Sequence, residues 1–296
     1  MPPNLQTSHL ILQLTDLHFT GDLTCVCKGA PRNLDVPCTE ALMSEFIDDL
    51  LDVEKPNLVV FSGDTIQTLA PQCRQVAVDA FTKIPHAEVL GNDDDDNSFD
   101  REDVLAAMMS KSYSYTQRSP KSVEGLSVQA PADGTWGKAG ENVFHMYFLD
   151  SGGNLNKARY LGKISRYDWI HESQVQYYRE FSDAAREATI AASSSAQLRP
   201  MPAVMFFHIP LQEFAEASLK YRWRTGEMNE KVEPSQVHSP LFSALVRKGE
   251  AKAVFTDHGH VNEYCYNRGA GVGLAYSSDD FSRRVRVIEW SVNSAN

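Results

Sequence analysis

Five short apolar runs in this sequence each end in side chains of the types that bind metal ions. The residues that follow the runs are Thr15-Asp16-Leu17-His18, Ser62-Gly63-Asp64, Gly91-Asn92-Asp93-Asp94, His208-Ile209-Pro210 and Thr256-Asp257-His258-Gly259-His260. Carboxylate, imidazole and amide groups together suit Fe, Mn or Zn better than Ca²⁺. Each group is weak evidence alone, but five such endings in one chain indicate one shared metal site.

The apolar runs have the length and composition of buried β-strands bounded by Gly, Pro or Asp. They cover residues 10–14, 58–61, 87–90, 203–207 and 253–255. Amphipathic stretches between them predict helices over residues 38–53, 76–81, 101–109, 168–192 and 239–247. Alternating strands and helices are typical of an α/β fold, in which ligands bind at the carboxyl ends of the strands. We therefore expect five strands to bring Asp, His and Asn side chains to one edge of a sheet.

The middle of the chain has a different pattern. Residues 111–150 alternate apolar and polar side chains and contain several Gly and Pro residues. This pattern predicts antiparallel hairpins that continue the sheet. Nothing in the sequence resembles an interdomain linker, so we predict a single domain over residues 1–296.

The composition excludes some classes of partner. The chain has 28 Lys and Arg residues against 39 Asp and Glu residues, a formal net charge of −11. That balance argues against a broad nucleic-acid-binding surface and against an anionic membrane as partner. The sequence shows no transmembrane run and no signal peptide, which predicts a cytoplasmic protein, or a secreted or vacuolar one if the chain is trimmed. It does not indicate an oligomeric state.

Three of the five cysteines lie close together in the sequence. Cys25, Cys27 and Cys38 share one predicted loop, whereas Cys73 and Cys265 stand alone. Three interpretations stay open for the cluster. The cysteines are free thiols, or they bind zinc without the usual fourth ligand, or Cys25 and Cys38 form a local disulfide in an oxidising compartment.

The order of the motifs, D-x-H, G-D, G-N-x-D, a lone H and H-x-H, resembles that of the calcineurin-like metallophosphoesterases. The closer resemblance is to the small purple-acid-phosphatase-like branch of plants and fungi. Segments that support this branch are 148–152 (FLDSG), 207–214 (FHIPLQEF), 260–265 (HVNEYC) and 283–289 (RRVRVIE). The resemblance extends from Leu10 to Glu289. It implies an α/β (α+β) fold in the form of a four-layer β-sandwich flanked by helices.

The resemblance also implies a two-metal site with seven ligands. The implied ligands are Asp16, His18 and His260 for the first metal, Asn92, His208 and His258 for the second, and Asp64 as the bridge between both. Two ions about 3.5–4 Å apart provide a hydroxide that attacks phosphorus in line, and they offset the charge on the phosphoryl oxygens. The expected activity is hydrolysis of a phosphate ester, most simply a phosphomonoester, with two divalent or trivalent ions of Fe, Mn or Zn as cofactors.

Two motifs depart from the family pattern. In the family the third motif is G-N-H-D or G-N-H-E, and its His protonates the leaving group or contacts the phosphate, whereas this chain has Asp93 there. Beside two cations the Asp93 carboxylate is expected to stay ionised, and an ionised carboxylate is a poor general acid. We predict that Asp64 and Asp93 are the catalytic residues. Because Asp93 replaces the His, we expect slow hydrolysis of alkyl phosphates and less impaired hydrolysis of activated aryl esters.

The second departure is in the last motif, which is G-H-x-H in the family. Here it begins with Asp257, whose carboxylate is expected to crowd or tune the second metal. Asn262 follows the motif and is expected to support the ligand histidines through hydrogen bonds. Asp95 and Asp96 are expected to be solvated.

Two other functions remain open. One is a pseudophosphatase that keeps the fold and acts as a binding or regulatory protein, although retention of all seven candidate ligands argues against it. The other is a phosphodiesterase, which would differ only in the substrate pocket. The sequence does not decide whether the substrate is a phosphoprotein, a nucleotide or a small ester.

Overall fold

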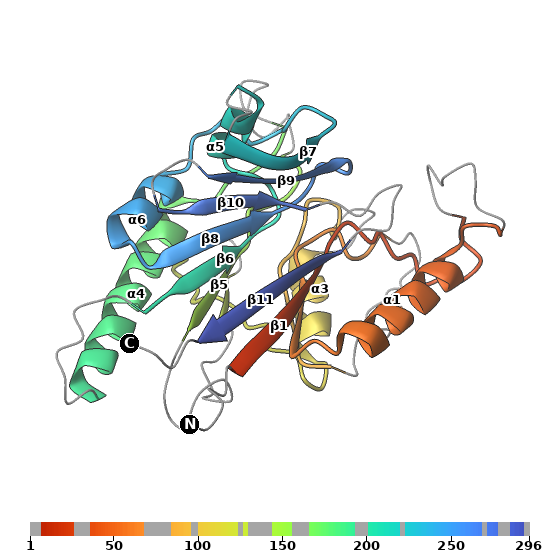
Figure 1. Ribbon diagram of the computed structural model, residues 1–296, viewed down its shortest axis with the longest axis horizontal. Helices are drawn as coiled ribbons and strands as arrows, with labels where there is room; N and C mark the ends of the chain where they lie inside the picture. Colours follow the sequence, from red (N-terminus) through yellow and green to blue (C-terminus); the bar gives the residue numbers. More distant parts are fainter. Residues whose placement is uncertain are drawn as a thin grey trace, which may run out of the picture.

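The computed structural model arranges its helices and strands in layers (Figure 1). It describes residues 7–26, 36–67, 84–95, 100–123, 127–129, 144–155, 166–192, 201–219, 223–267, 271–277 and 285–292. The strands are β1 (Thr7–Leu14), β2 (Leu58–Phe61), β3 (His86–Glu88), β4 (Ser127–Gln129), β5 (His145–Leu149), β6 (Ala203–Phe206), β7 (Arg224–Met228), β8 (Ala251–Thr256), β9 (Asn262–Asn267), β10 (Gly273–Tyr276) and β11 (Arg286–Val292). The helices are α1 (Glu40–Glu54), α3 (Arg101–Met109), α4 (Glu172–Ala192), α5 (Gln212–Ala215), the 3-10 helix η1 (Glu216–Ser218) and α6 (Leu241–Lys248).

The described strands form two mixed sheets. The first has the order β11-β1-β2-β3, and the second has the order β4-β5-β6-β8-β10-β9-β7. The strands that precede the candidate ligands are therefore divided: β1, β2 and β3 lie in the first sheet, and β6 and β8 lie in the second. The expectation of one sheet edge is wrong. In each sheet a central strand, β2 or β6, is apolar and buried on both faces, so each sheet needs a cover on both sides.

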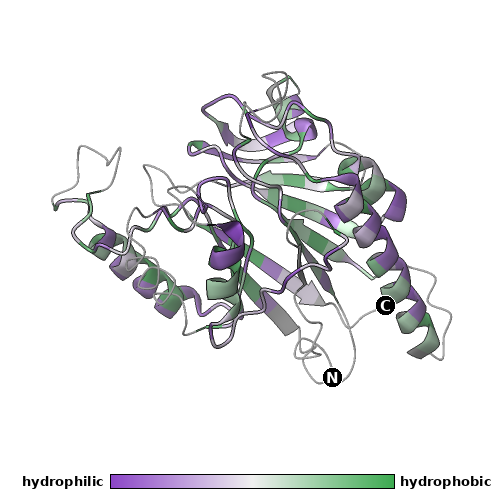
Figure 2. Ribbon diagram, turned by 180° about the vertical axis from the view of Figure 1, so that it is seen from behind, coloured by the Kyte–Doolittle hydropathy of each residue, from purple (hydrophilic) through white to green (hydrophobic). Residues whose placement is uncertain are grey.

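Side chains that alternate along the strands explain the layers. On β1, Leu12 and Leu14 pack against α1 and α3, whereas Ile11 points to the other sheet. On β6, Met205 packs against α4 and α6, whereas Phe206 points to the first sheet. This period of two is the normal geometry of a strand with two buried faces. In Figure 2 hydrophobic residues accordingly gather along the strands.

The layers therefore run helices, sheet, sheet, helices, and the predicted four-layer sandwich is confirmed. The two sheets share one apolar core between their inner faces. This shared core supports a single domain over residues 1–296, which stays a prediction. Among the described residues, no helix has both the length and the apolar composition that a membrane span needs.

Most predicted elements that fall on described residues are present. The antiparallel pairing of β4 with β5 agrees with the hairpin pattern predicted for residues 111–150. Helix α4 begins later than predicted, because the Asp168 carboxylate and the Gln174 side-chain carbonyl accept the backbone N–H groups of Trp169 and His171 ahead of it. The predicted helix over 76–81 lies outside the described residues.

No one of the three interpretations describes all the cysteines. Cys25 and Cys265 are free thiols. Cys38 is disulfide-bonded. A local Cys25–Cys38 disulfide is therefore wrong, because the Cys25 thiol takes no part in a disulfide bond.

Candidate metal centre

Four of the seven candidate ligands have a left-handed backbone. The φ angles are 52° at Asp16, 48° at His18, 50° at Asp64 and 81° at His258. Non-glycine residues avoid this region because of steric clashes, and they persist there mainly where the surrounding structure enforces it, often at functional sites. Hydrogen bonds between the first two loops hold the conformation: the Asp16 N–H donates to the Gly63 carbonyl at 3.0 Å, and the His18 N–H donates to the Asp64 carbonyl at 2.9 Å.

The loops after β1 and β8 bring together the three residues implied for the first metal. Asp16, His18 and His260 each offer a ligand atom, and these atoms lie within 4.8 Å of one another. The His260 Nε2 is 3.5 Å from Asp16 Oδ1. Both ring nitrogens of His18 are buried without a hydrogen-bond partner. A buried imidazole with no donor or acceptor nearby is costly unless something else satisfies it.

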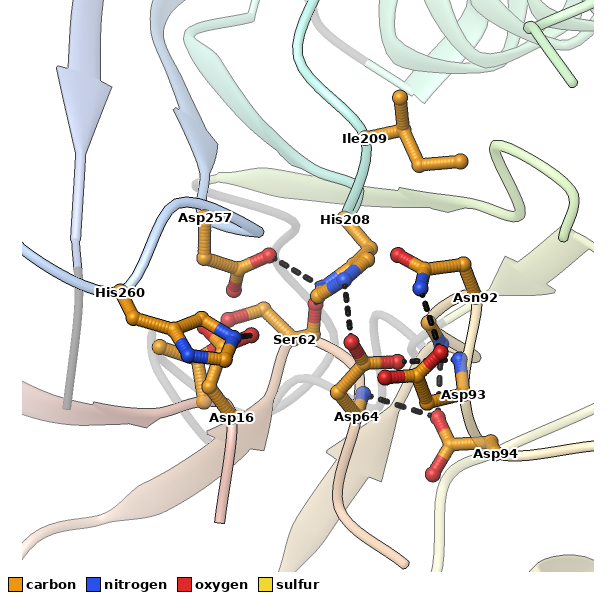
Figure 3. A network of polar contacts seen from close by, with 12 residues as sticks. Asp16, Ser62, Asp64, Asn92, Asp93, Asp94, His208, Ile209, Asp257 and His260 are labelled. Atoms are coloured by element: carbon orange, nitrogen blue, oxygen red, sulfur yellow. Dashed lines mark hydrogen bonds and ion pairs between the residues drawn. The ribbon is translucent and has the colours of Figure 1, made fainter. Parts of the chain in front are cut away.

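The second group forms around His208, which is fully buried. Ligand atoms of Asp64, His208 and His258 lie within 4.8 Å of one another. Asn92 is also buried, and its Oδ1 has no hydrogen-bond partner. The Nδ1 atom of His258 is likewise unpartnered. Six of the seven candidate ligands thus lie in two groups, and Figure 3 shows Asn92 beside Asp64 and His208. That these residues bind two metal ions stays a prediction.

Asp64 lies between the two groups. Its Oδ2 is 3.0 Å from His208 Nε2, and its Oδ1 accepts the Asp93 N–H at 2.7 Å. Burial opposes ionisation of this carboxyl, but His208 and the Asp93 N–H outweigh burial and lower the Asp64 pKa. Asp64 is therefore an ionised carboxylate at neutral pH, the form that can bridge two cations.

Two glycines allow this close approach. A Cβ atom at Gly63, where φ is +116°, would lie 2.4 Å from His208 Nδ1. A Cβ atom at Gly91 would lie 2.1 Å from Asp64 Oδ1. Any larger residue at either position would displace a candidate ligand.

The electrostatics of the centre favour cations. Burial, together with Asp257 and Asp64, raises the Asp16 pKa to about 7. Burial lowers the pKa of His18, and burial together with the charge of His208 lowers that of His258 to about 3. The two histidines are therefore neutral and carry free lone pairs, which is the form that binds metal. The site residues fit a pair of metal ions.

Asp93 faces this centre with its carboxylate held by amide donors. Its Oδ1 accepts from Asn92 Nδ2 at 2.8 Å and from Asn154 Nδ2 at 3.2 Å. Ligand atoms of His18, Asp64 and Asp93 lie within 4.8 Å of one another. The Asp93 carboxylate therefore acts as a hydrogen-bond acceptor beside the predicted first metal.

Asp257 contacts His208, a candidate ligand of the second metal, in the interior of the protein. Its Oδ1 is 2.6 Å from His208 Nδ1, and both side chains are fully buried. Figure 3 shows His208 between Asp257 and Asp64, with one ring nitrogen turned to each. Burial lowers the pKa of the imidazole, but the two carboxylates outweigh burial and raise it well above its usual value.

Asn262 was expected to support the ligand histidines, but its side-chain oxygen contacts another loop. Its Oδ1 accepts the backbone N–H groups of Asn229 and Glu230 at 3.0 and 3.1 Å. These contacts hold residues 229–230 against the start of β9. Support of the ligand histidines by Asn262 stays a prediction.

Sequence reasoning missed the role of Asp94. This buried carboxylate accepts backbone N–H groups from Asp64, Ile66 and Gly91 at 2.7–2.9 Å. It therefore fixes the loops after β2 and β3 against each other. The signal was present in the sequence, since Asp94 is the last residue of the G-N-x-D motif, but the motif alone does not say which groups it binds.

Arg101 holds the loop after β3 in place. It donates to the Gly91 carbonyl at 2.7 Å, to Asp95 at 3.1 Å and to Asp150 at 2.6 Å. Asp95 is therefore paired and largely buried, so the expectation that it is solvated is wrong. Asp96 lies outside the described residues.

Comparison with known proteins agrees with the motif pattern. Residues 9–261 match the family model of the calcineurin-like phosphoesterases. The chain belongs to this family. Over 96% of its length it is 28% identical to the "Probable inactive purple acid phosphatase 29" of Arabidopsis thaliana, of which it covers 77%. It is 29% identical over 97% of its length to "Phosphatase DCR2" of Saccharomyces cerevisiae, of which it covers 52%.

The family assignment extends to the fold. A dimetal phosphatase from Danio rerio superposes with a TM-score of 0.56 at 11% identity, over 91% of this chain and 87% of that one. At that identity the likeness shows the fold alone. The relatives place this calcineurin-like phosphoesterase in the purple-acid-phosphatase-like branch.

Proposed function

We propose that this protein is a two-metal phosphomonoesterase with an impaired acid step. One observation carries the proposal: two groups of metal-binding side chains, one with Asp16, His18 and His260 and one with Asp64, His208 and His258, lie side by side. Asp64 links them, because its ligand atom also lies within 4.8 Å of that of His18. Buried and unpartnered nitrogens on His18 and His258 support it, because a structure without a ligand for them would be penalised. The implied substrates are phosphate esters.

The residues divide into two sets around the bridge. Asp16, His18 and His260 would hold one ion, and Asn92, His208 and His258 would hold the other. When bound, two such ions make water nucleophilic near neutral pH and offset negative charge on the phosphoryl oxygens. The ligand types suit Fe, Mn or Zn.

Asp257 would act through His208 rather than on the substrate. A carboxylate at one imidazole nitrogen fixes the ring so that the other nitrogen faces the metal. The 2.6 Å contact to Nδ1 leaves Nε2 directed at Asp64, on the side where the second ion would bind. We therefore assign to Asp257 the positioning of this ligand.

Asp93 would limit the chemistry. Leaving groups with a high pKa, such as alkoxides, need a proton, whereas activated aryl leaving groups do not. Asp93 Oδ1 accepts two amide hydrogen bonds, so the geometry presents this oxygen as an acceptor and not as the donor that a leaving group requires. Hence we propose that aryl phosphates are turned over faster than alkyl phosphates.

A pseudophosphatase is the second candidate, and Asp93 is the observation that favours it. The two functions differ in one assay. The purified protein is loaded with Mn²⁺ or with Fe and Zn, and hydrolysis of an aryl phosphate is followed with and without a chelator. Metal-dependent turnover supports the enzyme, and metal binding without turnover of monoesters or diesters supports the binding protein.

A further inference from the structure

A short backbone pairing lies over the loop that carries Asn92 and Asp93. Asn154 and Tyr167 form an isolated antiparallel bridge, and the Leu155 N–H donates to the Arg166 carbonyl at 2.9 Å. We call residues 153–155 together with 166–168 the cover bridge.

The cover bridge contacts both halves of the centre. On one side, Asn154 Nδ2 donates to the Asn92 carbonyl at 3.0 Å and to Asp93 Oδ1 at 3.2 Å. On the other side, the Tyr167 ring packs edge-on against the His258 ring, with centroids 4.5 Å apart and an interplanar angle of 84°. The position of the cover bridge is thus tied to residues of both sheets.

Arg166, a residue of the cover bridge, carries a positive charge beside the candidate metal centre. Its guanidinium carbon lies 5.0 Å from the centroid of the Tyr167 ring. The side chain is 70% exposed and lies 4.0 Å from Glu233, which is 56% exposed. Exposed pairs of this kind contribute little, so an anion can replace Glu233 as partner.

The carboxylates of the centre give a further cation a role in phosphate binding. Carboxylates from both sheets line the centre, and Asp93, the one that is only partly buried, occupies the place where the family pattern has a His that protonates the leaving group or contacts the phosphate. Arg101 is already engaged by Asp95 and Asp150. A phosphate group at the centre would be held by the two metal ions but would meet repulsion from Asp93, and a further cation beside the site would offset that repulsion.

We propose that Arg166 binds the phosphate oxygens of a phosphomonoester dianion and replaces the contact that residue 93 does not make. This inference rests on the proposed function and adds a substrate-binding residue to it. The guanidinium suits the role, because its planar fork donates two parallel hydrogen bonds to a phosphate. Its place on the Tyr167 ring restricts the side chain before the anion arrives.

The test is calorimetric titration of inorganic phosphate into the full chain loaded with Mn²⁺. Arg166→Gln removes the charge but keeps most of the stem, and we expect it to bind phosphate at least about tenfold more weakly, as for a lost charge-assisted contact. Arg166→Lys keeps the charge without the fork and should recover part of that loss. Arg186→Gln is the matched control, because Arg186 is an exposed arginine on α4. It should bind phosphate like the wild type.

Metal content is measured in parallel by elemental analysis, and it should be the same in all four proteins. The proposal is overturned if Arg166→Gln binds phosphate as tightly as wild type, or if Arg166→Lys is as weak as Arg166→Gln. It is also overturned if metal-loaded wild type binds no phosphate, or if Arg166→Gln loses metal. Phosphate binding is read without turnover, so an inactive wild-type protein would contradict the proposed function and leave this test intact.

Discussion

The loop after β3 and the loop after β8 each carry an aspartate where the family motif has another residue, and the two aspartates lie in very different surroundings. Asp93 is only partly buried and is held by the side-chain amides of Asn92 and Asn154. Asp257 is fully buried and contacts the imidazole of His208. The two aspartates are therefore expected to have different effects. Asp93 affects the chemical step, and Asp257 affects how tightly the metal is held.

Asp64 connects the two loops, so its loss should have the largest effect. It accepts the Asp93 N–H and contacts His208 Nε2. We expect Asp64→Asn to lose bound metal and to reduce aryl phosphate hydrolysis to background, because a neutral amide cannot bridge two cations. Elemental analysis and a rate assay check this. Full metal content in the folded variant would contradict a bridging role.

Asp93→His tests the first half of the comparison. General acid catalysis typically contributes about 10²–10⁴-fold, so restoring the imidazole should raise turnover of alkyl phosphates by roughly 10²-fold or more. The gain on activated aryl phosphates should be much smaller. The measurement is the ratio of alkyl to aryl rates at saturating metal. An unchanged ratio would show that residue 93 does not limit the acid step.

Asp257→Gly tests the second half. A supporting partner of a ligand histidine is typically worth 10–100-fold in metal affinity, and we expect a loss of about that size. Asp257→Asn keeps a hydrogen-bonding oxygen and should lose less. Calorimetric titration with Mn²⁺ gives the affinities. The alkyl-to-aryl rate ratio at saturating metal should stay at the wild-type value, and a change in that ratio would remove the distinction between the two loops.

The smallest expected effect is on the pH dependence of stability, and it comes from Glu88 on β3, the strand before the Asp93 loop. Burial, with a contribution from Asp94 against that of Lys111, raises the Glu88 pKa from 4.5 to about 8. Between these pH values the folded protein holds a proton on Glu88 that the unfolded chain has lost. The free energy of unfolding therefore falls as the pH rises from about 4.5 to 8. Glu88→Gln should flatten this part of the profile and be the more stable protein at pH 9. Urea unfolding across this pH range is the check.

Much of this architecture could be predicted from the sequence because the information is local. The strands before Asp16 and His208 are short apolar runs with clear ends, and the metal-ligand types that follow them are visible one by one. The division of these strands between two sheets was not predictable in the same way. Apolar residues on both faces of β1 and β6 show that both faces are covered, but not whether a helix or another sheet covers them.

The contacts that hold the site could not be predicted, since they join residues far apart in the chain. Asp94 binds the N–H groups of Asp64 and Ile66, and Arg101 binds Asp150, and no local pattern indicates either pairing. Asp257 was recognised as a departure from the motif. Only the structure shows that it contacts His208 rather than solvent.

The most direct test of a two-metal phosphoesterase combines metal content and turnover on the same sample. The purified protein is loaded with Mn²⁺, freed of excess metal, and assayed by elemental analysis and by hydrolysis of an aryl phosphate. We predict about two metal ions per chain and turnover that a chelator abolishes and Mn²⁺ restores. Protein that retains two ions but hydrolyses neither monoester nor diester, or protein that retains no metal, would contradict this account.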